Sequence, residues 1–195
     1  RSGQPAFDLT FGVGFFQYMS NRPLALENYQ KAMAEYARDD YAALPDTIDF
    51  SLHQTVADVG GGTGQLIRML SAKWPSTKFI LFERPEVLEK SEVGRFANVQ
   101  LASGDFFQSM PFEADAILLA RVLHDWSDEQ ASVILQNCYH SLTQNGRLYI
   151  LEILNDEVPT PALNLHMALV CGSRERTSKE YRSLISKAGF SLIKT

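Results

Sequence analysis

The sequence has 195 residues, enough for one full α/β domain and a little more. Its composition, with 45% hydrophobic and 21% charged residues, is ordinary for a globular protein. A net charge of −5 without a basic cluster argues against nucleic acid as the main partner. No apolar run approaches the roughly 18 residues of a membrane span. Cys138 and Cys171 lack the paired spacing of a zinc site, and the first residues show no signal-peptide pattern, so we expect a cytoplasmic location.

The chain divides into two predicted parts, a helical linker segment over residues 1–50 and an α/β domain over residues 51–195. Within the first part, apolar side chains recur at helical spacing over residues 24–38, and Pro23 suits the first turn of that helix. Residues 1–22 are rich in Phe, Gly and polar side chains and are not assigned to an element.

From residue 55 onward, predicted strands and helices alternate. The run AILLA over residues 116–120 is unbroken and apolar, which is typical of a strand covered on both faces. Two helices begin with capping boxes, Ser127 with Gln130 and Thr177 with Glu180. The predicted strands cover 55–59, 78–82, 98–102, 116–120 and 147–154, with a sixth from Phe190, and the helices cover 64–73, 86–92, 128–142, 161–171 and 177–188. This order predicts an α/β fold whose mostly parallel sheet has helices on both faces.

The most informative motif is the run DVGGGTG over residues 58–64, which follows a buried strand and opens a helix. That arrangement is typical of a nucleotide-type pocket at the carboxyl edge of a parallel sheet, where glycines leave the backbone bare for a ligand. A dinucleotide fingerprint, G-x-G-x-x-G, would need glycine at position 65, which is Gln65. The actual pattern, G-x-G-x-G with Asp58 ahead of it, resembles the first motif of class I S-adenosylmethionine-dependent methyltransferases.

Further residues at predicted strand ends fit a cofactor. Glu83 ends the second strand, where an acidic residue commonly accepts hydrogen bonds from both ribose hydroxyls. Asp105 and Phe106 follow the third strand at the same edge, so Asp105 could bond the adenine amino group while Phe106 packs on the ring. Taken alone, the pair Gly104–Asp105 is equally consistent with a simple turn.

His124, in the run LHDW after the fourth strand, is the candidate general base. An ordinary histidine pKa of about 6.5 suits proton removal near neutral pH. Glu152 lies in the apolar fifth strand, where a carboxylate needs a partner, and an imidazole from the neighbouring strand end would serve. On spacing alone, Glu175 is a surface charge among arginines. His53, His140 and His166 lack a comparable placement.

The whole order of motifs resembles one family. The runs DVGGGTG, ERPEV, GDFFQSMP, LHDWSDE, LEI, RERTSKEY and KAGF follow one another as in the plant caffeate- and flavonoid-type O-methyltransferases and their bacterial polyketide-tailoring relatives. The resemblance covers essentially all of residues 3–195 and implies a Rossmann-like class I methyltransferase fold. It also implies that residues 1–50 are the remnant of an N-terminal dimerisation region, that a last strand follows residue 195, and that the full-length protein is a homodimer.

The resemblance also implies roles for individual residues. His124 corresponds to the general base, and Glu152 and Glu175 correspond to the acids that hold its imidazole, which replaces the surface interpretation of Glu175. Cofactor contacts correspond to Asp58, Gly60, Gly62, Glu83, Gly104, Asp105, Phe106 and Arg121, and acceptor contacts to Phe15, Tyr18, Asp125, Asn164 and Met167. In two departures from the family pattern, Arg84 stands where Leu is commoner and Asn164 replaces an acid frequent in bacterial members.

The implied activity moves the methyl group of S-adenosylmethionine to a hydroxyl of a small aromatic or polyketide-like acceptor, without a metal, nucleic acid or membrane. His124 would remove the hydroxyl proton, while Glu152 and Glu175 would fix its tautomer and stabilise the imidazolium. Two alternatives stay open. One is a regulatory or scaffold relative that binds the cofactor without catalysis, and the other, disfavoured by Gln65, is a NAD-dependent oxidoreductase.

Overall fold

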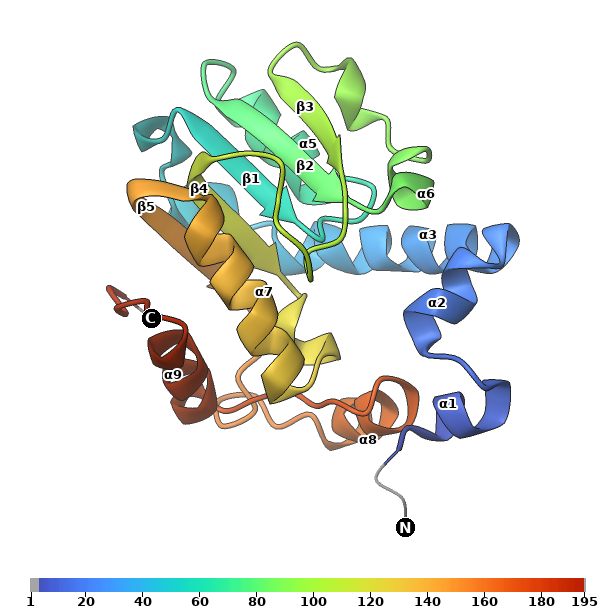
Figure 1. Cartoon of the computed structure of the whole chain (residues 1–195). Coiled ribbons are helices and arrows are strands. Elements are labelled where there is room, and N and C mark those ends of the chain that lie inside the picture. Colours follow the sequence, from blue (N-terminus) through green and yellow to red (C-terminus); the bar gives the residue numbers. More distant parts are fainter. Residues whose placement is uncertain (1–3, 195) are drawn as a thin grey trace.

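Five strands form one parallel sheet at the centre of the computed structural model, which describes residues 4–194 (Figure 1). The strands are β1 (Thr55–Val59), β2 (Lys78–Glu83), β3 (Val99–Ser103), β4 (Ala114–Ala120) and β5 (Leu142–Leu151). Their order in the sheet is β3-β2-β1-β4-β5, and every neighbouring pair is parallel. The chain therefore builds one half of the sheet outward from β1 and then returns to build the other half from β4. The point where the order reverses is where open α/β sheets bind ligands.

Helices cover both faces of this sheet, as the alternation of elements predicts. They are α1 (Ala6–Phe11), α2 (Phe15–Ser20), α3 (Pro23–Asp40), α4 (Leu44–Thr47), α5 (Gln65–Lys73), α6 (Pro85–Leu88), α7 (Asp128–Ser141), α8 (Pro161–Val170) and α9 (Ser178–Lys187). Both predicted capping boxes are present, at the starts of α7 and α9. Within residues 4–194, no helix has both the length and the apolar character needed to cross a membrane.

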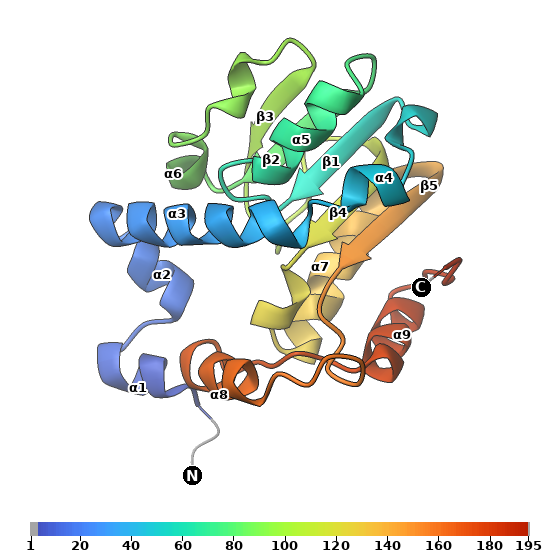
Figure 2. The ribbon, with the colours of Figure 1, turned by 180° about the vertical axis from the view of Figure 1, so that it is seen from behind.

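Alternation along the strands divides the core into two layers. Ala57 and Val59 of β1 face α7 and α9, and they pack in a cluster with Ile134 and Leu184. Val56 faces the opposite way, into the cluster that contains Leu66 and Leu70 of α5. The helix α5 lies over this face of the sheet (Figure 2). Because successive side chains of a strand point to opposite faces, both faces of β1 are apolar and buried, as a central parallel strand requires.

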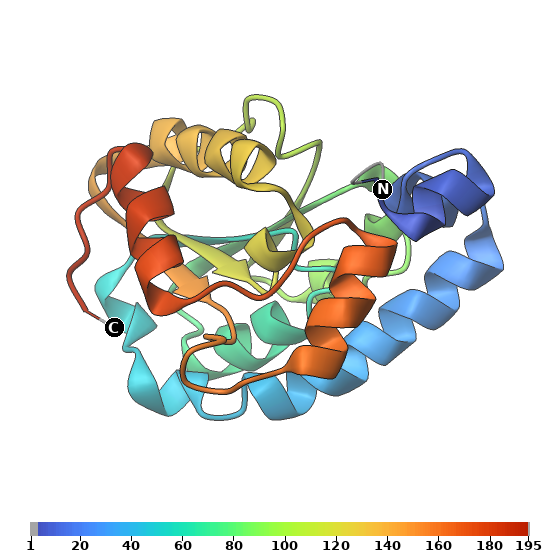
Figure 3. The same ribbon diagram turned by 90° about the horizontal axis from the view of Figure 1, so that it is seen from below.

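The carboxyl ends of the strands meet a group of helices that lie across the sheet edge. Seen from below, α3, α8 and the pair α1–α2 border this edge together with α7 and α9 (Figure 3). Contacts between α1 and α8 connect the start of the chain to a segment more than 150 residues later. The predicted domain boundary at residue 50 falls between α4 and β1, and this division stays a prediction.

The fifth strand differs from the sequence prediction at both ends. It begins at Leu142 rather than at residue 147, because Leu142 pairs with Ala114 and the register then shifts before Arg147 pairs with Ala116. Asn145, with φ 65°, lies within this irregularity, where Asn tolerates the left-handed region better than most residues. The strand ends at Leu151, so Glu152 lies just beyond it and not within it as predicted.

Other predicted elements are also different. The expected helix over residues 86–92 is only the single turn α6, and the unassigned residues 1–22 contain α1 and α2. The predicted sixth strand is wrong for the described residues, since residues 190–194 belong to no strand. Phe190 instead donates its N–H to the carbonyl of Ile185 and packs edge-on against Tyr139, with ring centroids 5.3 Å apart. These contacts hold it on the surface of α7 and α9 rather than beside a strand.

Candidate active site

The glycine-rich turn after β1 is shaped so that only glycine fits. Gly60 has φ +73° and donates its N–H to the carbonyl of Phe82 at 2.9 Å, which fixes the turn against β2. A Cβ at Gly60 would lie 3.0 Å from Cγ2 of Val122, and a Cβ at Gly62 would lie 2.9 Å from Oε1 of Gln30. Both glycines therefore have a left-handed backbone conformation, and another side chain lies close to where a Cβ would be. This bare stretch of backbone satisfies the geometric requirement of the predicted cofactor turn.

Asp58 is completely buried directly below this turn. Neither of its carboxyl oxygens has a hydrogen-bond partner among the described residues. Burial, together with the charge of Glu83, raises the pKa of Asp58 to about 7. A buried carboxyl without a partner is costly, so its presence at the turn points to a ligand that supplies a donor or a positive charge. The ammonium group of an amino acid moiety fits this requirement.

Glu83 ends β2 beside the same turn, as the sequence predicts. Its Oε2 accepts a hydrogen bond from the N–H of Gly62 at 3.2 Å, and its Oε1 accepts one from the N–H of Arg84 at 2.8 Å. Burial raises the pKa of Glu83 above its ordinary value, while these backbone donors oppose the rise. The two halves of the predicted cofactor site, Asp58 and Glu83, therefore lie on either side of the turn that carries Gly62.

The predicted adenine contacts lie in the turn after β3. A Cβ at Gly104 would lie 2.6 Å from Cε2 of Phe82, so the packing of that ring requires glycine here. Asp105 is exposed, and its Oδ1 already accepts the N–H of Phe107 at 2.9 Å, which is the local bond of a simple turn. The ring of Phe106 lies beside the position that a Cβ at Gly60 would occupy, at 3.4 Å. The adenine roles of Asp105 and Phe106 stay predictions.

His124 lies in the 3-10 helix Leu123–Asp125 that follows β4, and the two predicted acids converge on it. Its Nδ1 is 3.2 Å from Oε2 of Glu152 and 3.4 Å from Oε1 of Glu175. Neither contact is aligned well enough to be a hydrogen bond, so the imidazole lies between two carboxylates without a directed partner at Nδ1. The surface interpretation of Glu175 from spacing alone is wrong, because its side chain is fully buried beside His124. The role that the family resemblance implies for Glu175 stays a prediction.

Arg121 connects the same two carboxylates. Its Nη1 donates to Oε2 of Glu152 at 3.2 Å and to Oε2 of Glu175 at 3.1 Å, while its Nη2 donates to Oε1 of Glu175 at 2.6 Å. Arg121 has φ 57°, a conformation that costs a non-glycine residue about 1–3 kcal/mol unless its surroundings hold it. The guanidinium supplies that hold. Its predicted role as a cofactor contact stays a prediction, because within residues 4–194 its guanidinium donates hydrogen bonds to the carboxylates of Glu152 and Glu175 beside His124.

The charges around the imidazole set its protonation. Burial disfavours the imidazolium, but the carboxylates of Asp125, Glu152 and Glu175 outweigh burial and raise the pKa of His124 to about 11. Burial likewise opposes the ionised form of Glu175, yet His124 and Arg121 lower the pKa of Glu175 to about 2. The ligand-free site therefore holds a protonated imidazole beside the ionised Glu175, with Arg121 as a second positive charge.

One nitrogen and two carboxylates at this spacing also resemble a metal site. Single ligand atoms of His124, Glu152 and Glu175 lie within 4.8 Å of one another. However, Arg121 already occupies both carboxylates with its guanidinium, and Oε1 of Glu152 accepts the backbone N–H groups of Val122 and Leu123 at 3.1 and 2.8 Å. The donor set is therefore engaged in orienting the His124 turn, and the absence of a metal site stays a prediction.

Arg176 is a functional residue that the sequence prediction missed. It is buried, and its guanidinium donates to the carbonyls of Leu123 and Trp126 at 2.6 and 2.7 Å and to the carboxylate of Asp128 at 2.8 Å. These bonds clamp the backbone on both sides of His124. Because two of the three partners are main-chain carbonyls some fifty residues away, no side-chain pattern in the sequence indicates this role.

The predicted acceptor residues lie on the helices across the sheet edge. Phe15 and Tyr18 on α2 pack with the rings of Phe7 and Phe11 from α1, at centroid distances of 4.7 to 5.3 Å. Asp125 lies 3.4 Å from Nε2 of His124. Of these three residues, only Asp125 is in contact with the imidazole, and the contact of all three with an acceptor stays a prediction.

Asn164 and Met167 belong to α8. The amide of Asn164 is used at both ends, since Nδ2 donates to Oδ1 of Asn155 at 2.9 Å and Oδ1 accepts the backbone N–H of Glu175 at 2.8 Å. Asn164 thus holds the segment that carries the second acid, a role that does not require contact with the acceptor. Met167 is buried at 5% exposure beneath the same helix.

Two hollows on the surface lie away from these residues. One, of about 500 Å³, is lined by His53, Trp74 and Lys78 at the amino end of β2, and another, of about 550 Å³, is lined by Met110 and Asn137 beside α7. Both are remote from the carboxyl edge of the sheet. The site is therefore identified by its converging groups and not by a preformed hollow.

The sheet order, the glycine turn and the His124 set together define a Rossmann-like methyltransferase fold. A model of the O-methyltransferase domain matches residues 1–191, and the chain belongs to that family. Among curated proteins, it is 33% identical to the phenazine O-methyltransferase PhzM of Lysobacter antibioticus, over 98% of this chain and 59% of that protein. It is 34% identical to caffeic acid 3-O-methyltransferase 1 of Ocimum basilicum, over 94% of this chain and 53% of that protein.

Solved structures of O-methyltransferases have the same fold. NcsB1 from neocarzinostatin biosynthesis, crystallised with S-adenosyl-L-homocysteine and 1,4-dihydroxy-2-naphthoic acid, superposes with a TM-score of 0.91 at 26% identity, covering 97% of this chain and 60% of NcsB1. Human N-acetylserotonin methyltransferase, crystallised with S-adenosylmethionine, superposes with a TM-score of 0.86 at 30% identity, covering 98% of this chain and 58% of that one. The chain thus spans between half and two thirds of the length of these relatives.

Proposed function

We propose that this protein transfers the methyl group of S-adenosylmethionine to a hydroxyl of a small aromatic or polyketide-like acceptor. One juxtaposition carries the proposal. Val122 lies against the glycine turn, 3.0 Å from where a Cβ of Gly60 would be, and the imidazole of His124 follows two residues later among three carboxylates. A backbone fit for a cofactor and a candidate base therefore meet at one sheet edge, and membership of the O-methyltransferase family supports this reading.

The cofactor would be held by residues on both sides of the glycine turn. Asp58, which has no hydrogen-bond partner among the described residues, would accept from the ammonium group of the cofactor. The bare backbone at Gly60 and Gly62 would let the cofactor approach closely, and Glu83 would accept hydrogen bonds from its ribose hydroxyls. When bound, S-adenosylmethionine supplies an electrophilic methyl group on a positively charged sulfur. The cofactor bound in the NcsB1 and human N-acetylserotonin methyltransferase crystals supports the same ligand here.

The residues of this chain would do the rest of the chemistry by positioning and proton transfer. Holding an acceptor oxygen in line with the methyl group can supply about 7–11 kcal/mol of the barrier in favourable cases. With a positively charged sulfur bound beside the ring, the pKa of His124 would fall and Nε2 would be free of its own proton. Nε2 would then take the hydroxyl proton as the oxygen is methylated, while Glu152 and Glu175 stabilise the resulting imidazolium. Arg176 keeps the turn that carries His124 in place.

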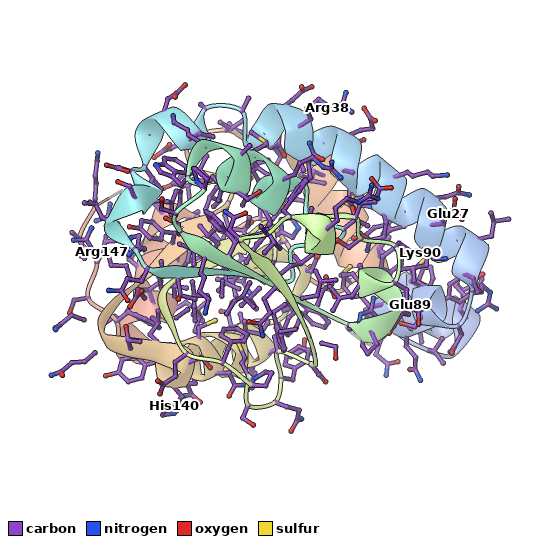
Figure 4. The ribbon with its side chains drawn as sticks, turned by 90° about the horizontal axis from the view of Figure 1, so that it is seen from above. Glu27, Arg38, Glu89, Lys90, His140 and Arg147 are labelled. Atoms are coloured by element: carbon purple, nitrogen blue, oxygen red, sulfur yellow. The ribbon has the colours of Figure 1, made fainter. Side chains whose placement is uncertain are left out.

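The decisive experiment compares two histidine variants. His124→Gln should lower methyl transfer about 10²- to 10⁴-fold, the usual contribution of a general base, while affinity for S-adenosyl-L-homocysteine stays near that of the wild type. His140→Gln is the matched control, because His140 lies on the exposed side of α7 and points outward (Figure 4). Turnover is measured by mass shift of a panel of hydroxylated aromatics that includes caffeic acid and 1,4-dihydroxy-2-naphthoic acid. Unchanged turnover in His124→Gln would remove His124 from the role.

The two alternative functions predict different results in binding and transfer measurements. Calorimetric binding of S-adenosylmethionine without transfer to any member of a broad panel would favour a scaffold relative, whereas binding of NAD would favour an oxidoreductase.

We also propose a homodimer, which the exposed apolar side chains of Leu9, Leu24 and Tyr36 on α1 and α3 support, since exposed apolar patches commonly mark interfaces. A cytoplasmic location stays a prediction.

A further inference from the structure

A short helix near the predicted acceptor site is tied to the sheet edge by one arginine. None of the six residues of α2 is fully buried, and the helix is held by contacts with α1 and α3 and by the contacts described here. Nη1 of Arg84 donates a hydrogen bond to the carbonyl of Phe16 at 3.2 Å and another to the hydroxyl of Ser20. Both partners belong to α2, while Arg84 directly follows β2. The guanidinium therefore joins two segments that are more than 60 residues apart in the chain.

The other side of Arg84 faces the predicted ribose carboxylate. Nε of Arg84 lies 3.8 Å from Oε1 of Glu83, and Nη1 lies 3.4 Å from Oε1 of Glu86. The arginine side chain is only 30% exposed, so these charges are partly shielded from water. Both bonds to α2 and the contact with Glu86 use the single nitrogen Nη1, while Nε faces Glu83, so the guanidinium reaches α2 and Glu83 at once through two different nitrogens.

A contact between two aromatic rings links α2 to the segment that contains His124. Phe16 of α2 stacks on Trp126 with ring centroids 5.2 Å apart and an interplanar angle of 26°. The guanidinium carbon of Arg84 lies 6.0 Å from the centroid of the same Phe16 ring. Trp126 follows His124 by two residues, so Phe16 lies between the arginine beside Glu83 and the segment that carries the base.

We propose that Arg84 is a positioning residue that docks α2 against Trp126 and thereby sets the geometry of the acceptor site. The inference rests on the proposed function, because it takes α2 as part of the wall that receives the aromatic acceptor. The inference goes beyond the proposed function because it assigns a part in acceptor recognition to Arg84. At this position the commoner residue of the family pattern is Leu. A leucine there has no donors for the Phe16 carbonyl or the Ser20 hydroxyl.

The test separates acceptor binding from cofactor binding and from chemistry. Arg84→Met should raise the KM for the best acceptor of the hydroxylated-aromatic panel about tenfold, as expected for loss of a charged hydrogen bond. The kcat and the Kd for S-adenosyl-L-homocysteine should each change less than about threefold. Arg84→Lys should give an acceptor KM between those of the wild type and Arg84→Met, since lysine keeps the positive charge but not the planar fork of the guanidinium. Arg38→Met, at an exposed arginine of α3 paired with Glu35, is the control (Figure 4).

A double-mutant cycle tests the docking contact itself. Ser20→Ala should raise the acceptor KM in the wild type but not in Arg84→Met, because the hydroxyl then has no guanidinium to bind. Additive effects of the two changes would overturn the proposal. A parallel loss of S-adenosyl-L-homocysteine affinity in Arg84→Met would also overturn it, since Arg84 would then act through Glu83.

A spectroscopic readout keeps the inference testable even if no acceptor is found. In a Trp74→Phe background, Trp126 is the sole tryptophan of the chain. Arg84→Met should then shift its emission to longer wavelength and increase its quenching by acrylamide, because Phe16 no longer covers the indole. Unchanged emission and quenching would mean that α2 docks without Arg84. Failure of the proposed methyl transfer would leave this measurement intact.

Discussion

The guanidinium of Arg121 forms a forked pair with the carboxylate of Glu175, with Nη1–Oε2 at 3.1 Å and Nη2–Oε1 at 2.6 Å. Both side chains are largely shielded from water, and the same guanidinium reaches Glu152. Without it, two carboxylates would lie close together in a buried place with only an imidazole to balance them. The fork therefore orients the acids that hold His124, and it accounts for the left-handed backbone of Arg121.

Arg121→Lys should lower kcat about tenfold or more while the Kd for S-adenosyl-L-homocysteine changes less than about threefold. Lysine keeps the positive charge but cannot donate to both oxygens of Glu175 in parallel. The measurement is a comparison of steady-state kinetics with calorimetry. Arg174→Lys is the matched control, because Arg174 makes a similar fork with Glu180 in an exposed position. If cofactor affinity fell as far as kcat, Arg121 would be a cofactor contact, as the family resemblance implies.

The protonation of His124 should depend on the charge of the bound cofactor. Asp125, Glu152 and Glu175 raise its pKa to about 11 against the effect of burial, so the ligand-free protein holds the imidazolium at neutral pH. A sulfonium beside the ring would favour the neutral imidazole and lower this pKa. S-adenosyl-L-homocysteine, whose sulfur is uncharged, is the matched control. We expect the His124 resonances to titrate at lower pH with S-adenosylmethionine than with S-adenosyl-L-homocysteine, and equal values would show that no such charge lies near the ring.

The same shift has a consequence for stability. Because the pKa of His124 in the folded protein lies above the ordinary value of about 6.5, its charge stabilises the fold fully below about pH 6.5. This contribution should disappear as the pH rises towards 11. The difference in free energy of unfolding between the wild type and His124→Gln should therefore shrink over that interval, as measured by urea denaturation at a series of pH values. A difference that grew with pH would contradict the charged state.

Asp58→Asn should have opposite effects on stability and on cofactor affinity. Burial raises the pKa of Asp58 to about 7, so the wild type loses stability as the pH rises from about 4 to about 7 and the carboxyl is forced to ionise without a partner. At pH 8 the variant should be more stable by about 1–3 kcal/mol, and at pH 4 the two should be equal. Its affinity for S-adenosyl-L-homocysteine should fall about tenfold.

The control for this prediction is Asp46→Asn, whose carboxylate is exposed and pairs with Lys73. It should leave cofactor affinity unchanged. A variant Asp58→Asn that was less stable than the wild type at pH 8 would show that the carboxylate has a partner in solution, and the case for an unmet ligand contact would fail.

Local pattern was sufficient to predict the central strands. The runs around Val56, Phe79 and Leu118 are apolar and bounded by turn residues, so their strands agree with prediction to within two residues. The start of β5 was missed because the polar run from Leu142 to Gly146 has no strand pattern, and only its pairing with β4 makes it a strand. The sixth strand was wrongly predicted for a related reason, since a strand needs a partner that local sequence does not reveal.

The positions of Glu83 and His124 at the carboxyl edge of the sheet agree with prediction, because each directly follows a strand with a clear apolar pattern, while their roles stay predictions. The site was not predictable where the partner is main chain. Arg176 binds the carbonyls of Leu123 and Trp126, and Arg84 binds the carbonyl of Phe16, contacts that depend on the tertiary fold alone. Glu175 lies between these two cases. Its neighbouring arginines in the sequence suggest a solvent-exposed charge, and only the family resemblance predicts a place beside His124, where the side chain is fully buried.

The reversal of strand order between β1 and β4 has an evolutionary consequence. Residues fit to hold a methyl donor, around Gly60 and Glu83, come from one half of the sheet, and the base with its acids comes from the other half. The helices α1, α2 and α8 belong to neither half, since they lie across the seam. If the proposed function holds, drift in α1 and α2 would change which hydroxylated compound is accepted while the donor grip and the proton acceptor stay intact, whereas α8 is constrained by Asn164, which binds the backbone of Glu175.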